Sequence, residues 1–234
     1  KKINIINFAE QMHSSHEELM TFVGYLDEVR PEYVICFSGT NDINRGYKNV
    51  SKFTDLNTTW INFFNRGDAL GVVREKNILK FLIKIIFRFG NKYQRISSSN
   101  LSYQNISEKE IPIKLFSNKI EIMNSICISK KIYILHILQP DLILKKKKIT
   151  TEFEYFNMLE KSRIDYVKEH MNVFKEYMNT NKLKEESKYV KYLDLTEVFD
   201  KMDKPVFIDK AHLNDKGYDI VSEKIAYEIK KQFL

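Results

Sequence analysis

Residues 33–42 read Tyr33-Val34-Ile35-Cys36-Phe37-Ser38-Gly39-Thr40-Asn41-Asp42, an apolar run that ends in a turn of small and polar residues. A short apolar run bounded by turn residues is typical of a buried strand. Amphipathic segments separate this run from others of the same kind, as expected when helices cover both faces of a sheet. The pattern predicts an α/β protein with a central parallel sheet. The predicted strands are Ile3–Asn7, Tyr33–Phe37, Lys131–Leu138 and Val190–Leu195.

A first helix is predicted over Glu17–Val29. Its N-cap is expected at Ser14 or Ser15, with Glu17 or Glu18 in the capping-box position. Two later helices follow from apolar residues at steps of three and four, one over roughly 151–178 and one after residue 214. The stripe of the second helix is Phe156, Leu159, Arg163, Val167, Met171, Phe174 and Met178, and that of the third is Tyr218, Val221, Ile225, Ile229 and Phe233.

The composition fits one domain, 1–234, because 234 residues with 43% hydrophobic content suffice for one sizeable core. Cys36 and Cys127 lie in apolar contexts and do not form a disulfide framework. No signal peptide or transmembrane span is recognisable, and the sequence leaves the localisation open.

The formal net charge of +7 does not indicate nucleic-acid binding, because the basic residues are spread along the chain among 31 acidic ones. Lys145–Lys148 is the one dense basic run. We interpret it as a solvated loop, with contact to an acidic glycan or a lipid headgroup as the alternative.

A helical insertion is expected around 57–118. Within it, 76–88 places Lys76, Lys80, Lys84 and Arg88 at four-residue steps in an apolar run. Such a helix could pack into the domain with its basic edge in water, cap an acyl pocket, or contact a membrane surface or a partner.

Two short motifs carry groups suited to acyl transfer. The amide of Asn41 can donate hydrogen bonds to a developing negative oxygen. Asp209 stands three residues before His212, close enough to fix the tautomer and orientation of the imidazole. His212 would then serve as general base and acid, while Asp209 stabilises the imidazolium.

These motifs resemble the SGNH (GDSL) hydrolase superfamily. Gly39-Thr40-Asn41-Asp42 is similar to its third block, Gly-x-Asn-Asp, and Asp209-Lys210-Ala211-His212 to its last block, Asp-x-x-His. Residues 6–19 are similar to the second block, in which Met12 stands where the family usually has a glycine. The resemblance runs over nearly the whole chain and implies a flavodoxin-like three-layer α/β sandwich of the SGNH type.

The resemblance also implies roles for single residues. At position 12 a backbone N–H survives the change from glycine to methionine. At position 39 a glycine permits a backbone conformation or a close approach that a Cβ would obstruct. Asp42 is expected to hold its loop by bonds to backbone N–H groups. The predicted catalytic residues are His212 and Asp209, the oxyanion hole is assigned to Asn41, Gly39 and Met12, and the substrate contacts to Thr40 and His13.

The family's first block, Gly-Asp-Ser with the nucleophile, has no counterpart here, since Gly67-Asp68 is followed by Ala69. The resembled fold has the strand order 2-1-3-4-5. The strand that ends in the first block is strand 1, which lies between the strands matched here by Ile3–Asn7 and Tyr33–Phe37. We therefore expect an upstream strand ending in Gly-Asp-Ser, from the same polypeptide or from another chain. The alternative is a displaced nucleophile among Ser14, Ser15 and Ser38, which are better explained as helix caps and turn residues.

The resemblance implies a serine-dependent O-acyl ester hydrolase or O-acetyl transferase that acts on acetylated carbohydrate or a small acyl ester, without a cofactor. The alternative is a non-catalytic SGNH-like domain that binds a glycan or a protein. Met12 and the absent serine favour it, and the retained Asn41, Asp209 and His212 oppose it. His13 and His16 have metal-ligand spacing, but without acidic or cysteine partners no metal site is predicted.

Overall fold

The computed structural model describes residues 4–9, 13–48, 111–183 and 187–233. Apart from Ile111, these residues all lie in one compact unit, Lys1–Lys48 with Pro112–Leu234. Of the predicted insertion at 57–118, only the last residues are described, as the start of a helix, and the basic stripe of 76–88 lies outside the described residues. The elements are α1 (Ser15–Val29), β1 (Tyr33–Ser38), α2 (Thr40–Lys48), α6 (Ile111–Lys130), β2 (Tyr133–Leu138), α7 (Thr150–Asn157), α8 (Lys161–Leu183), β3 (Val190–Asp194) and α9 (Asp215–Phe233).

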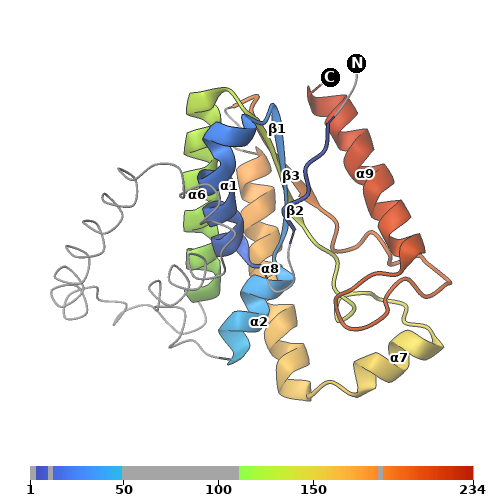
Figure 1. Ribbon diagram of the computed structural model, residues 1–234. Helices are drawn as coiled ribbons and strands as arrows, with labels where there is room; N and C mark the ends of the chain where they lie inside the picture. The colour runs from blue at the N-terminus through green and yellow to red at the C-terminus, as the bar shows by residue number, and fades with distance from the viewer. Residues whose placement is uncertain (1–3, 10–12, 49–110, 184–186, 234) are drawn as a thin grey trace, which may run out of the picture. The chain divides into compact units, whose positions relative to one another are not determined.

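The three strands form a small open parallel sheet in the order β1-β2-β3, which confirms the α/β class. Tyr33 pairs with Tyr133, and Ile134 pairs with Val190. Helices α1, α6 and α8 lie on one face of the sheet and α9 lies on the other (Figure 1). The predicted strand at 131–138 begins two residues late, because Lys131 has a positive φ of 58° where α6 ends.

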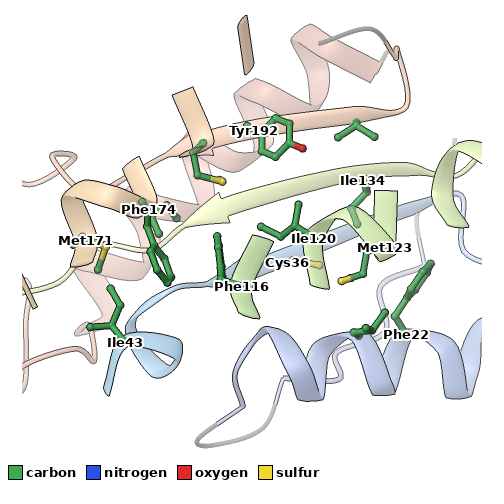
Figure 2. Packing of buried hydrophobic residues seen from close by; sticks show 14 of the residues in the cluster. Phe22, Cys36, Ile43, Phe116, Ile120, Met123, Ile134, Met171, Phe174 and Tyr192 are labelled. Carbon is green, nitrogen blue, oxygen red and sulfur yellow. The ribbon is translucent and has the colours of Figure 1, made fainter. Parts of the chain in front are cut away.

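Each face of the sheet has its own hydrophobic core, and β2 contributes to both. Ile134 and Leu138 point into the core under α1, α6 and α8, while Leu135 and Ile137 point into the core under α9. Figure 2 shows the first core, in which Phe116 of α6 stacks on Phe174 of α8 at 4.3 Å between ring centroids. Both faces of the strand are buried, so its sequence is apolar without alternation.

Helix α1 begins at Ser15, two residues before the predicted start, and ends at Val29 as predicted. Ser14 is the N-cap residue, and the Glu17 carboxylate accepts a bond from the Ser14 backbone N–H at 2.9 Å. Its C-cap is Arg30, whose φ of 47° is left-handed, directly before Pro31. The cap position and the capping-box position are therefore confirmed as Ser14 and Glu17.

The single long helix predicted over 151–178 is wrong, because the structure has two helices there. The chain leaves α7 at Met158, and the Glu160 carbonyl accepts the first backbone bonds of α8, from Arg163 and Ile164. Figure 1 shows α7 turned away from α8. The break contains no Gly or Pro, so the sequence carries no breaker signal. The buried part of the stripe is confirmed within α8, at Val167, Met171, Phe174 and Met178.

The terminal helix follows residue 214 as predicted, and Val221 is buried against the sheet. Tyr218 departs from the prediction, because it is 51% exposed in the first turn of α9. The side chain of Phe233 lies outside the described residues.

The strand predicted at Ile3–Asn7 is wrong for the residues described. Residues 4–9 have no regular secondary structure, and Ile5 is 87% exposed. A strand needs a hydrogen-bonded neighbour, and within the described part of the chain neither this segment nor the outer edge of β1 has one. Ile35 of β1 is accordingly 48% exposed.

The interpretation of Lys145–Lys148 as a solvated loop holds for Lys146 and Lys147, which are 71% and 60% exposed, and is wrong for Lys145 and Lys148. Lys145 is 1% exposed and pairs with the buried carboxylate of Glu152. Lys148 is half-buried, with its ammonium group 4.3 Å from the ring centroid of Phe156. Four like charges in a row indicated solvation, but the acidic partner of Lys145 lies seven residues further on, where no local pattern reveals it.

Candidate active site

The loops after the three strands meet at the carboxyl-terminal edge of the sheet. Thr40, directly after β1, donates a hydrogen bond from Oγ1 to Asp141 Oδ2 at 3.3 Å, in the loop after β2. The backbone N–H of Leu142 in that same loop donates to the carbonyl of Lys210 at 3.0 Å. Lys210 lies between Asp209 and His212, in the loop after β3. The two predicted motifs thus lie at one edge of the sheet, where open α/β sheets carry their sites.

The predicted contact between Asp209 and His212 is confirmed. Asp209 Oδ2 lies 2.6 Å from His212 Nδ1, and Oδ1 accepts the backbone N–H groups of Ala211 and His212, each at 2.8 Å. Partial burial by itself raises the pKa of Asp209, but these backbone and side-chain donors outweigh it and leave the pKa below its usual value. The His212 side chain is 56% exposed, so its Nε2 can meet a substrate.

The Asn41 amide is oriented by the backbone of the segment before α1. Its Nδ2 donates to the carbonyl of His13 at 2.8 Å. An amide nitrogen carries two N–H groups, so this bond uses one of them and fixes the direction of the other. Asn41 and His13 are both partly exposed. Thr40 is only 2% exposed, and its hydroxyl donates to Asp141. This bond joins the start of α2 to the loop after β2.

Gly39 stands where only glycine fits. Its φ is +120°, and a Cβ there would lie 2.5 Å from Cδ1 of Leu138. A positive φ of this size is strained for any other residue. This confirms that Gly39 is needed for its backbone conformation and for the close approach of β2. Met12, the other backbone member of the predicted oxyanion hole, lies outside the described residues.

Asp42 has the structural role expected of it. Both of its carboxylate oxygens lie 3.2 Å from the backbone N–H of Ser15, the first residue of α1. The side chain is 5% exposed. Asp42 therefore ties the start of α2 to the start of α1 and holds the turn that carries Asn41.

The three serines weighed as displaced nucleophiles are each bonded to a carboxylate. A hydroxyl has one proton to donate, so with these bonds none of the three serines donates to His212. Their hydroxyls donate as follows: Ser14 to Glu17 at 2.6 Å, Ser15 to Asp42 at 2.6 Å and Ser38 to Glu18 at 2.5 Å.

Burial raises the pKa of Glu18 to about 8, and the charges of Asp42 and Glu17 add to the shift against the bond from Ser38. In the unfolded chain the pKa returns to about 4.5. Between these values the folded protein holds a proton that the unfolded chain has lost, so Glu18 makes stability fall as pH rises.

We expect Glu18→Gln to reduce the fall in unfolding free energy with rising pH. Between pH 5 and 9 the variant should lose less unfolding free energy than the wild type, by on the order of 1 kcal/mol or more. Urea unfolding at several pH values measures this, with the exposed Glu28→Gln on the same helix as the control. Asp141, whose pKa burial raises to about 6, contributes equally to all three proteins. Parallel pH profiles for Glu18→Gln and the wild type would contradict the prediction.

Two residues near the site were not singled out from the sequence. Asp141 is 2% exposed and links Thr40 to the backbone N–H of Ile143 at 2.9 Å. Its position after Pro140 at a strand end was the available signal. Glu152 is fully buried, and its only local signal was a carboxylate in the first turn of a helix.

Within the described residues no group of three or more His, Cys, Asp or Glu side chains could hold a metal ion. None of the helices searched in the same residues is long and apolar enough to cross a membrane. His136 and His170, both buried, lie in β2 and α8, where His136 bonds Asn124 at 2.8 Å.

Comparison with models of protein families and with curated proteins finds no match to this chain.

Proposed function

We propose that this protein is a serine-dependent O-acyl ester hydrolase or O-acetyl transferase of the SGNH type. The observation that carries the proposal is the bond between Asp209 and His212 Nδ1 at 2.6 Å, on the strand-end loop that also contacts the loop after β2. That bond fixes the tautomer in which Nε2 can accept a proton.

The proposed reaction uses the side chains at this edge in three roles. His212 Nε2 takes the proton from a serine hydroxyl as the oxygen attacks the acyl carbon, and it later returns a proton to the leaving alcohol. Asp209 stabilises the imidazolium that forms. The second N–H of Asn41 donates to the oxyanion, and neutrality of the amide leaves the basicity of His212 undisturbed.

The serine is proposed to come from a strand that pairs with the edge of β1 that has no partner among the described strands. A groove of about 310 Å³ lies between β1 and α9, and Phe37, Val221 and Ile225 form the apolar part of its lining beside Asp219 and Ser222. Ile35 points to the same face as Phe37 and is 48% exposed. A strand at the usual spacing of about 4.8 Å would place side chains over both. With this strand the sheet would have four of the five strands in the order 2-1-3-4-5 of the resembled superfamily.

The second candidate is a non-catalytic domain of the same fold that binds a glycan or a protein. The bonds of Ser14, Ser15 and Ser38 favour it, because each of these three hydroxyls donates its proton to a carboxyl group and not to His212. The oriented imidazole and the oriented amide oppose it, since binding alone requires neither.

The test is covalent labelling of the full-length protein with a fluorophosphonate, followed by peptide mass spectrometry. The proposal expects one labelled serine, on a segment that pairs with β1, and loss of acetyl-ester hydrolysis in step with labelling. A label on Ser14, Ser15 or Ser38 would identify a displaced nucleophile instead. Absence of both label and hydrolysis, with intact folding, would leave the binding domain as the answer. Inhibition by metal chelators would contradict the cofactor-free mechanism.

A further inference from the structure

An ion pair is buried beneath the loop that carries His212. Lys145 Nζ lies 2.5 Å from Glu152 Oε2, and the two side chains are 1% and 0% exposed. Removing two charges from water is costly unless further hydrogen bonds satisfy them. The Glu152 carboxylate meets that condition, because it also accepts backbone N–H groups from Ile149 at 3.3 Å, Val206 at 2.9 Å and Phe207 at 3.3 Å.

The bonds from Val206 and Phe207 tie Glu152 directly to the loop that carries His212. Phe207 forms an antiparallel bridge with Leu213, and the Asn214 N–H donates to the Val206 carbonyl at 2.9 Å. Between them, the Ile208 N–H donates to the His212 carbonyl at 2.9 Å. Residues 206–214 therefore form a closed loop with Glu152 bonded to one arm and His212 held by that same arm.

We propose that Glu152 is a positioning residue for His212, with Lys145 as the cation paired with it in the protein interior. The effect of Glu152 on catalysis rests on the proposed function, whereas its effect on the structure of the loop does not. Glu152 fixes the backbone at 206–207, and the bridge to Leu213 carries that constraint to the imidazole.

An apolar side chain could fill the same space but could not accept the two N–H groups. A buried donor without an acceptor is costly, so the arm would shift to find water. Glutamate alone would leave an uncompensated buried charge, which explains why a lysine is buried with it. The neighbouring pair of Lys147 and Asp203 joins similar segments on the surface, with side chains 60% and 75% exposed. It provides a matched control.

The test compares two double variants of the full-length protein. Glu152→Leu with Lys145→Met replaces the pair by apolar side chains, and buried pairs often tolerate that replacement with little loss of stability. The rate of amide exchange at 206–212 should rise at least about tenfold, because the N–H groups of Val206 and Phe207 lose the Glu152 carboxylate as their acceptor. Acetyl-ester kcat should fall about ten- to a hundredfold with KM changed less than about threefold, since the imidazole is displaced while the pocket remains.

Glu152→Gln with Lys145→Met keeps an amide oxygen that can accept the N–H groups of Val206 and Phe207. Its exchange rate at 206–212 and its kcat should therefore be close to those of the wild type. Lys147→Met with Asp203→Asn should change neither. If the apolar variant does not fold, Glu152→Asp keeps the charge, shortens the side chain by one methylene and should raise exchange at the same amides.

Unchanged exchange at 206–212 in a folded Glu152 variant that lacks the acceptor, or in Glu152→Asp, would overturn the proposal. Wild-type protein without esterase activity would contradict the proposed function alone, because the exchange measurement needs no turnover.

Discussion

His212→Ala is expected to lower kcat for hydrolysis of a nitrophenyl acetate by about a thousandfold or more in the full-length protein. The variant removes the group that accepts the serine proton and protonates the leaving alcohol. Because the side chain is 56% exposed, its removal leaves no cavity, so the melting temperature should stay close to that of the wild type.

Asp209→Asn should also lower activity strongly. An amide can hold the ring, but it cannot stabilise the imidazolium, and it can donate to Nδ1 and select the wrong tautomer. Asp203→Asn, an exposed carboxylate further back in the chain, is the control and should retain activity. Near-full activity in His212→Ala would show that the bonded pair of Asp209 and His212 does not serve acyl transfer.

Asn41→Ala is expected to lower kcat about a hundredfold with little change in KM. The amide donates to an oxygen that is negative only in the transition state, so substrate binding should scarcely depend on it. Steady-state kinetics on the same ester measure both constants. Loss of the bond from Nδ2 to the His13 carbonyl should reduce stability by only about 1 kcal/mol.

Asn44→Ala is the matched control, since Asn44 lies one turn later on α2 and bonds Arg163 instead. It should keep kcat within about threefold of the wild type. If Asn41→Ala and Asn44→Ala lose activity equally, α2 acts as a scaffold and the oxyanion donor lies elsewhere.

Local signals predicted the strands β1, β2 and β3 and the N-cap of α1, because turn residues and a capping box lie next to the elements that they end or begin. The contact between Asp209 and His212 was predictable for the same reason, because the two residues lie three positions apart. The requirement for glycine at position 39 followed from the resemblance, and the atom that a Cβ would meet belongs to Leu138 in another strand. The contacts that could not be predicted join distant parts of the chain. Glu152 bonds backbone at 206–207, and Thr40 bonds Asp141, over separations that no periodic pattern records.

The two failed elements have a related physical cause. An apolar run such as 3–7 predicts a strand only if a neighbour pairs with it, and the described residues supply none. The bend at 158–160 follows from packing, since α8 keeps its stripe on the core while α7 turns so that Glu152 reaches residues 206–207. Helical periodicity continues through the bend and therefore hides it.

The register of the sheet has a consequence for biosynthesis. Tyr33 and its partner Tyr133 are 100 positions apart in the chain. At about 5–20 residues per second, the ribosome makes β1 roughly 5–20 s before β2 exists to pair with it. During that interval the edge of β1 that pairs with β2 in the folded protein stays open, and an open edge on an apolar segment can recruit other strands. The capped helix α1, which precedes β1 and packs on it, is the one neighbour among the described elements that can cover this segment while the rest of the chain is synthesised.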